Sequence, residues 1–176
     1  MNLNVQTIFF LYLIDDFLLH FLGFAIGHNL FENIKYHVVA GLYNERIDDL
    51  RRLERDNKNI TIYSNVSDMA ALMAMCDIAV SAAGTILYEC CSIGIPTIFY
   101  CLSDDQTNEG LYFSRDAGMI YAGDARTDMQ STVRNVFSGI SYLMGNKKAK
   151  EKMQDKLLRV VDGQGADRIA QELILL

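Results

Sequence analysis

The sequence predicts an α/β fold built on an open, doubly wound parallel sheet. Short apolar segments that suit buried strands alternate with helical segments along most of the chain. The strand segments, residues 95–101 for example, are apolar at almost every position, which is typical of parallel strands covered on both faces. Strand and helix alternating at this spacing predict βαβ units, and therefore a Rossmann-like sheet with helices on each side.

The predicted strands share a short length and a nearly unbroken run of apolar, β-branched or aromatic residues. They span residues 7–13, 35–40, 59–64, 77–81, 95–101 and 119–121. In an open sheet of this kind, ligands bind beyond the carboxyl ends of the strands, near the point where the strand order reverses. The tight turn from Ser81 to Thr85 follows one predicted strand and therefore lies at such an end.

Capping and stop signals place several of the predicted helices. Asp68 stands at the start of one helix, and Gly94 followed by Pro96 marks the end of another before the next strand. Asp104 or Asp105 is expected to cap a third helix. The predicted helices span residues 15–30, 45–56, 68–75, 85–93, 106–117, 128–144, 147–161 and 167–175.

The apolar stretch from Ile8 to Ile26 invites a membrane interpretation. Asp15, Asp16 and His20 interrupt it, however, and charge at the centre of a membrane span is costly. No basic region precedes the stretch, which argues against a signal peptide. We interpret it as a strand followed by a helix buried on a wide face, with a membrane-associated hairpin as the alternative. The residues expected on the buried face are Leu18, Leu19, Leu22, Ala25 and Ile26.

Length and composition exclude several classes of protein. A chain of 176 residues with 51% hydrophobic residues and one proline indicates a single domain, spanning residues 1–176, rather than a disordered protein. A net charge of -6 with interleaved acids and bases argues against nucleic acid as a partner. The cysteines lie in apolar contexts without a C-x-x-C pair, which predicts buried reduced thiols in a cytoplasmic protein. They are Cys76, Cys90, Cys91 and Cys101.

Metal and nucleophile motifs are missing from the sequence. His20, His28 and His37 lack the spacing of a metal site, and neither a D-x-D pair nor a G-x-S-x-G elbow occurs. We therefore predict no metal and no cofactor, and we assign no catalytic residue.

The turn from Ser81 to Thr85 is the strongest functional signal. It opens a helix, and the first N–H groups of a helix are unpaired and carry partial positive charge, so they suit a phosphate. Glu89 follows one helical turn later, where a carboxylate can accept hydrogen bonds from ribose hydroxyls. The structural alternatives are that the segment from Ser81 to Thr85 is only a tight turn and that Glu89 is only a solvated surface charge. No P-loop motif is present.

These residues belong to an ordered series that continues on both sides of the turn. The series consists of Val66, Asp68-Met69, Asp77, Ser81-Ala82-Ala83-Gly84-Thr85, Leu87-Tyr88-Glu89, Gly94-Ile95-Pro96, Gln106 and Gly118. With these residues in this order, the chain resembles the C-terminal, nucleotide-binding domain of two-domain GT-B glycosyltransferases of the MurG type. The closer resemblance is to the PseG/SpsG branch, which contains UDP-sugar hydrolases.

The resemblance implies a role for each residue of a UDP site. Val66 meets the uracil with its backbone, and Glu89 binds the ribose. Gln106 reaches towards the diphosphate or the sugar. The negative charge that develops on the departing UDP is stabilised by the helix terminus instead of by a metal. The loop that holds the diphosphate begins at Ser81 and acts through Ala83, Gly84 and Thr85.

The sequence departs from the family pattern at two residues, in one loop and in its domain content. Ala83 replaces a usual glycine, and Ile86 stands where a hydroxyl residue is common. Residues 10–16 lack the glycine-rich loop that normally borders the sugar and diphosphate. The N-terminal domain, which in this family binds the acceptor and usually supplies the catalytic base, has no counterpart in these residues.

The leading hypothesis is therefore the UDP-sugar-binding half of a GT-B enzyme, inactive by itself. The ligand is UDP or a UDP-amino sugar, and the complete enzyme either hydrolyses it with release of UDP or transfers the sugar in glycan or polysaccharide biosynthesis. The missing half comes from a separate N-terminal-half subunit, docked on the apolar first helix, or the chain forms a homodimer. The expected location is cytoplasmic or peripheral at the inner membrane face. The alternatives are a noncatalytic Rossmann-like interaction module and the catalytic subunit of a split UDP-N-acetylglucosamine transferase.

Overall fold

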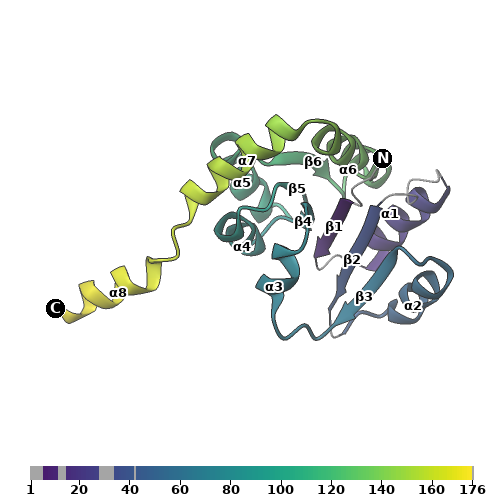
Figure 1. Cartoon of the computed structure of the whole chain (residues 1–176), viewed down its shortest axis with the longest axis horizontal. Coiled ribbons are helices and arrows are strands. Elements are labelled where there is room, and N and C mark those ends of the chain that lie inside the picture. Colours follow the sequence, from purple (N-terminus) through teal and green to yellow (C-terminus); the bar gives the residue numbers. More distant parts are fainter. Residues whose placement is uncertain (1–5, 12–14, 28–33, 42, 176) are drawn as a thin grey trace.

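In the described residues, a six-stranded parallel sheet forms the centre of the protein (Figure 1). The computed structural model describes residues 6–11, 15–27, 34–41 and 43–175. The strand order is β3-β2-β1-β4-β5-β6, so the order reverses between β1 and β4. The strands are β1 (Gln6–Leu11), β2 (Ile34–Ala40), β3 (Ile60–Ser64), β4 (Ile78–Ala82), β5 (Thr97–Cys101) and β6 (Ile120–Asp124).

Helices cover both faces of this sheet, which confirms the doubly wound α/β fold predicted from the sequence (Figure 1). Each predicted strand and helix is present, with differences at the ends. Residues 12, 13 and 28–30, which the predictions also included, lie outside the described residues. The helices are α1 (Asp15–Gly27), α2 (Ile47–Asp56), α3 (Met69–Ala74), α4 (Ile86–Ile93), α5 (Asp105–Tyr112), the π-helical turn η1 (Phe113–Ala117), α6 (Met129–Gly145), α7 (Lys147–Val160) and α8 (Gly165–Ile174).

The predicted helix over residues 106–117 is divided into α5 and the π turn η1. Gly110 lies so close to β5 that a Cβ there would be 2.8 Å from the Phe99 ring. After η1 the chain leaves the helix through Gly118, at a φ of 73° that favours glycine. The change of helix type thus occurs where the helix packs tightly on the sheet.

The apolar helix α1 is part of the hydrophobic core. Leu18, Leu22 and Ala25 are buried as predicted, whereas Leu19 and Ile26 are only partly buried. The deepest positions also include Phe17 and Phe21, which were not among the residues predicted for the buried face.

Aromatic stacking fixes α1 against its neighbours. Phe17 stacks on Tyr100 of β5 with ring centroids 4.0 Å apart, and Phe21 stacks on Phe137 of α6 at 4.3 Å. Because the core covers this face, the expectation that α1 offers an apolar docking face is wrong. Among the helices of the described residues, none combines the length and the apolarity needed to cross a membrane.

The four cysteines are unpaired, as predicted. Cys90, Cys91 and Cys101 are buried, and Cys76 is partly buried. Burial raises the pKa of the Cys90 thiol to about 12, so this side chain is a neutral core residue at physiological pH.

Tyr100 has a fully buried hydroxyl that finds no hydrogen-bond partner among the described residues. Burial raises the pKa of this phenol well above its usual value. An unsatisfied buried hydroxyl costs about 1–3 kcal/mol. We therefore expect Tyr100→Phe to leave the free energy of unfolding unchanged or to raise it by about 1 kcal/mol, measured by urea denaturation.

Tyr63→Phe is the matched control for that prediction. The Tyr63 hydroxyl lies 2.8 Å from Nδ1 of His37, so its removal breaks a hydrogen bond and should lower the free energy of unfolding by about 1 kcal/mol. A clear loss of stability in Tyr100→Phe would mean that the Tyr100 hydroxyl has a stabilising partner.

The C-terminal helices differ in how they meet the body of the protein. α7 packs on α4, and a Cβ on Gly94, the C-cap of α4, would lie 2.9 Å from Cγ of Leu158. α8 has no buried residue and extends away from the body (Figure 1). Its Ile169, Leu173 and Ile174 are 65%, 66% and 84% exposed. α8 therefore adds nothing to the core.

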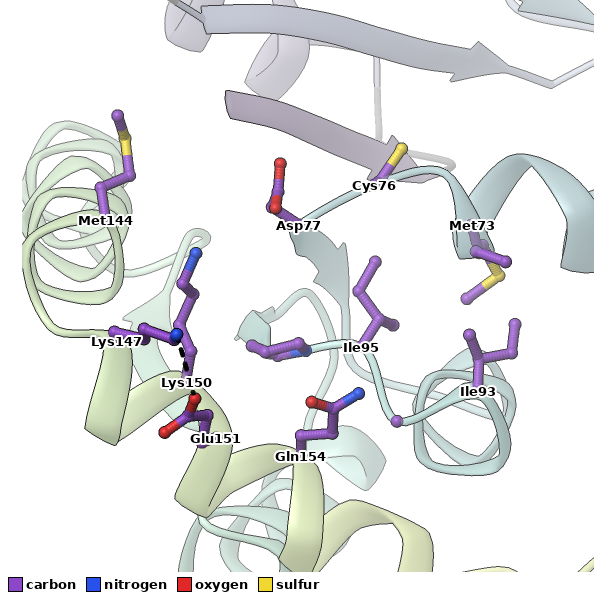
Figure 2. A pocket seen from close by; sticks show the side chains of 13 residues that line it. Met73, Cys76, Asp77, Ile93, Ile95, Met144, Lys147, Lys150, Glu151 and Gln154 are labelled. Carbon is purple, nitrogen blue, oxygen red and sulfur yellow. Dashed lines mark ion pairs between the residues drawn. The ribbon is translucent and has the colours of Figure 1, made fainter. Parts of the chain in front are cut away.

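A cavity of about 560 Å³ opens at the amino ends of β4 and β5. Figure 2 shows apolar side chains such as Met73 and Ile95 on one side and the α7 residues Lys147 and Glu151 on another. Lys147 is paired with Glu151 at 3.7 Å, so the two charges offset each other. The cavity lies at the opposite edge of the sheet from the turn between β4 and α4.

Candidate functional site

The site is built on the turn that joins β4 to α4, at the carboxyl edge of the sheet. β4 pairs with β1, where Leu11 is aligned with Ser81, so this turn follows the reversal of strand order. In doubly wound sheets a ligand crevice lies at this position. The fold thus places the predicted turn where the topology favours ligand binding.

The backbone of the turn presents three N–H groups. Gly84 adopts a φ of 145°, and α4 begins directly after Thr85. The amides of Gly84, Thr85 and Ile86 have no hydrogen-bond acceptor among the described residues. Unpaired amides at a helix start, together with the helix dipole, suit a bound anion.

Two side chains complete this surface. Thr85 is exposed, and its hydroxyl makes no capping hydrogen bond. Glu89 is exposed in the first turn of α4, and its carboxylate has no ion-pair partner in the part of the chain that the structure describes. Because the two residues are four apart on a helix, their side chains project from the same face. A hydroxyl, a carboxylate and three amides thus lie close together.

Two of the predicted contacts are used inside the fold. The Ala83 N–H donates to the carbonyl oxygen of Tyr100 at 2.7 Å and so extends the sheet by one residue. Ser81 is 1% exposed, and its hydroxyl donates to the carbonyl oxygen of Ala82 at 2.9 Å. Of the predicted donors, Gly84 and Thr85 therefore remain available, and the Ile86 amide joins them.

The Ile86 amide was not among the predicted donors, because the family pattern at that position concerns a side-chain hydroxyl. The general rule that the first N–H groups of a helix are unpaired would have identified it. Ile86 thus departs from the family pattern in its side chain while its backbone remains available.

Val66 lies in the loop between β3 and α3, also at the carboxyl edge, and is partly buried. The next helix is capped as predicted, because the Asp68 carboxylate accepts a hydrogen bond from the Ala71 N–H at 2.8 Å. α3 packs against α4, which connects the Val66 loop with the helix that carries Glu89.

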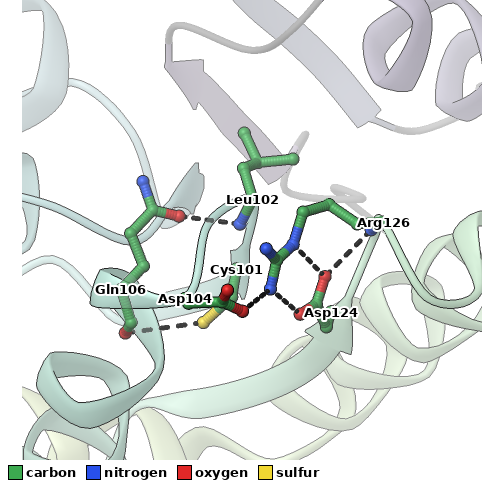
Figure 3. Close-up of polar contacts among 6 residues, drawn as sticks. All are labelled: Cys101, Leu102, Asp104, Gln106, Asp124 and Arg126. Carbon is green, nitrogen blue, oxygen red and sulfur yellow. Dashed lines mark hydrogen bonds and ion pairs between the residues drawn. The ribbon is translucent and has the colours of Figure 1, made fainter.

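Gln106 lies in the first turn of α5 and turns back towards β5 (Figure 3). Its Oε1 accepts a hydrogen bond from the Leu102 N–H at 2.7 Å, and its carbonyl oxygen lies 3.6 Å from Sγ of Cys101. The side-chain oxygen is therefore occupied by the protein, and the amide nitrogen is the group left for a ligand.

Arg126 joins two loops at the same edge, and no sequence motif indicated this. Its Nη2 lies 2.8 Å from Oδ1 of Asp104 and 2.6 Å from Oδ2 of Asp124, and its Nε donates to Oδ1 of Asp124 at 3.0 Å (Figure 3). The hydrogen bonds from Arg126 lower the pKa of the Asp124 carboxyl. Asp104 and Arg126 are distant in sequence but follow neighbouring strands.

A family model decides what kind of domain this is. The model for the glycosyltransferase family 28 C-terminal domain matches residues 27–172. The chain belongs to this family. No curated protein matches the sequence with significance.

Solved structures share the fold of this family 28 C-terminal domain. MurG from Acinetobacter baumannii has a TM-score of 0.73 at 17% identity, covering 97% of this chain and 52% of that one. A UDP-GlcNAc 2-epimerase from Neisseria meningitidis, bound to UDP-GlcNAc, has a TM-score of 0.70 at 17% identity, with 98% and 45% covered. The spinosyn rhamnosyltransferase SpnG, complexed with thymidine diphosphate, has a TM-score of 0.61 at 15% identity, with 88% and 42% covered. The chain thus spans about half the length of these proteins.

The resemblance to the GT-B C-terminal domain is confirmed by these comparisons. The closer assignment to the PseG/SpsG branch stays a prediction. The binding roles of the residues in this family 28 C-terminal domain also stay predictions.

Proposed function

We propose that this chain is the UDP-sugar-binding half of a GT-B-type enzyme. One observation carries the proposal: in the part of the chain that the structure describes, the amides of Gly84, Thr85 and Ile86 and the carboxylate of Glu89 have no protein partner, and they lie at the reversal of strand order. The family of the chain supports a nucleotide-sugar ligand, and so does the UDP-GlcNAc bound to the structurally similar 2-epimerase.

The arrangement suits the parts of a nucleoside diphosphate. The diphosphate lies against the three amides and the Thr85 hydroxyl, and Glu89 accepts hydrogen bonds from the ribose hydroxyls. Val66 contacts the uracil through its backbone. As the bond to the sugar breaks, negative charge develops on the diphosphate, and the fixed amides at the start of α4 stabilise it without reorganising.

The proposed substrate is a UDP-amino sugar, in the synthesis of a cell-surface polysaccharide or another glycan. The complete enzyme hydrolyses it with release of UDP, as in the PseG/SpsG branch, or transfers the sugar to an acceptor. We place the acceptor-binding surface and the catalytic base on a separate N-terminal-half subunit, or on a second copy of the chain. The chain alone is then a binding subunit in the cytoplasm or at the inner face of the membrane.

Titration calorimetry of the whole chain with UDP, uridine and ADP tests the proposal. We expect UDP to bind at least about tenfold more tightly than uridine, because uridine lacks the charged groups that meet the α4 terminus. ADP should bind more weakly than UDP, because its base does not match the Val66 loop.

Two outcomes would contradict the proposal. The absence of UDP binding at millimolar concentration would favour the noncatalytic interaction module. Equal affinity for UDP and uridine would show that the amides at the start of α4 do not hold phosphate.

A further inference from the structure

Arg126 holds together the two loops that leave the carboxyl ends of β5 and β6. The loop after β6 begins at Ala125, whose N–H donates to the carbonyl oxygen of Cys101 at 3.0 Å. Arg126 follows, and its backbone N–H donates to Oδ1 of Asp124 at 2.9 Å. This second bond fixes the turn, so the guanidinium group is directed across to Asp104 (Figure 3).

The loop of residues 102–106, between β5 and α5, is held from two sides. On one side the Gln106 side chain accepts a hydrogen bond from the Leu102 N–H. On the other side Arg126 bonds Asp104 through one nitrogen that also contacts Asp124. Asp104 is 98% exposed, so the position of its side chain depends on this contact and not on packing.

Positive charge is scarce at this edge. In the described loops that follow the carboxyl ends of the strands, the cationic side chains are Arg46 and Arg126. Arg46 follows β2, on the far side of β1 from the site, and is paired with Asp49 at 2.8 Å. Arg126 is therefore the cation on the α4 side of the reversal, where Asp104, Asp105 and Asp124 are the nearby acids.

We propose that Arg126 is a positioning residue of the nucleotide site, which fixes the loop of residues 102–106 and neutralises the carboxylates beside an approaching diphosphate. The inference rests on the proposed function, since it requires an anionic ligand at the β4–α4 turn. The guanidinium group acts through the loop and through the local charge, while Gly84, Thr85 and Ile86 contact the phosphates. Uncompensated carboxylates near the diphosphate would oppose its binding.

The test compares Arg126→Gln with the wild-type chain in calorimetry with UDP and uridine. Because the ion pair is exposed, the expected loss of UDP affinity is about fivefold, with less than a twofold change for uridine. At about 1 M salt, which screens exposed charges, the loss should shrink. The variant Arg126→Gln/Asp104→Asn should recover UDP binding, because it removes a carboxylate along with the cation.

Hydrogen exchange of the unliganded proteins measures the loop directly. Arg126→Gln should speed the exchange of the peptide that contains residues 102–106 while leaving the peptides of the core strands unchanged. Arg126→Lys keeps the positive charge but loses the paired N–H donors of the guanidinium group. Its UDP affinity should therefore be closer to the wild-type value than its rate of hydrogen exchange in residues 102–106.

Failure of the two proposals gives different results. If the wild-type chain does not bind UDP, the proposed function is wrong, and the ligand-linked role of Arg126 is wrong with it. If the wild-type chain binds UDP and Arg126→Gln binds it equally well, the role of Arg126 alone is overturned. Equal losses for UDP and uridine would also overturn it, because they would indicate general damage to the fold.

Discussion

Glu89→Gln is expected to weaken UDP binding by about ten- to hundredfold, because a hydrogen bond to a charged acceptor contributes about 1.5–3 kcal/mol. The carboxylate is exposed and unpaired within the described residues, so the free protein loses no internal contact when the charge is removed. Glutamine keeps the size of the side chain but offers one oxygen in place of two, and its NH₂ group cannot accept from a ribose hydroxyl. Titration calorimetry measures the change.

A modified ligand and a distant substitution provide the controls for this prediction. With 2′-deoxy-UDP, Glu89→Gln should lose less affinity than it loses with UDP, because one of the two hydroxyls is already missing. Glu172→Gln on the exposed helix α8 should bind UDP like the wild-type chain. UDP affinity that is unaffected by Glu89→Gln would remove the ribose contact from the proposed site.

The architecture was predictable because each strand carries its own signal. β5 is buried at every position, and only its first residue, Thr97, is not hydrophobic, since helices cover both faces of the sheet; Gly94 with Pro96 marks where α4 ends. The ends of elements were less predictable. β6 continues to Asp124, beyond the predicted end, because pairing with β5 extends it through Ala122, Gly123 and Asp124, which have no strand pattern of their own.

The candidate site was predictable in its location and less so in its individual contacts. The turn after β4 could be recognised from small residues before a helix. The internal bonds of Ser81, Ala83 and Gln106 could not, because they depend on where the neighbouring strand β5 lies. The pair between Arg126 and Asp104 likewise exists only because β5 and β6 are adjacent.

Phe21→Ala is expected to lower the free energy of unfolding by about 3–5 kcal/mol, the usual cost of deleting a buried phenylalanine side chain. Phe21 is 0% exposed and stacks on Phe137 of α6, with Tyr36 of β2 at 6.2 Å in an edge contact. The variant creates a cavity where α1, α6 and the sheet meet, and urea denaturation measures the loss.

The size of that loss distinguishes a core helix from a docking or membrane helix. If α1 used its apolar residues for a partner or a lipid surface, truncation of Phe21 would change the unfolding of the isolated chain little. Leu173→Ala on α8 is the matched control, because Leu173 is also apolar but 66% exposed, and it should change the free energy of unfolding by less than about 0.5 kcal/mol.

Since a domain is stable by only about 5–15 kcal/mol, Phe21→Ala could abolish folding, and Phe21→Leu then provides the measurable case at a cost of about 1 kcal/mol. Equal effects of the substitutions at Phe21 and Leu173 would mean that α1 does not pack in the core as the structure places it.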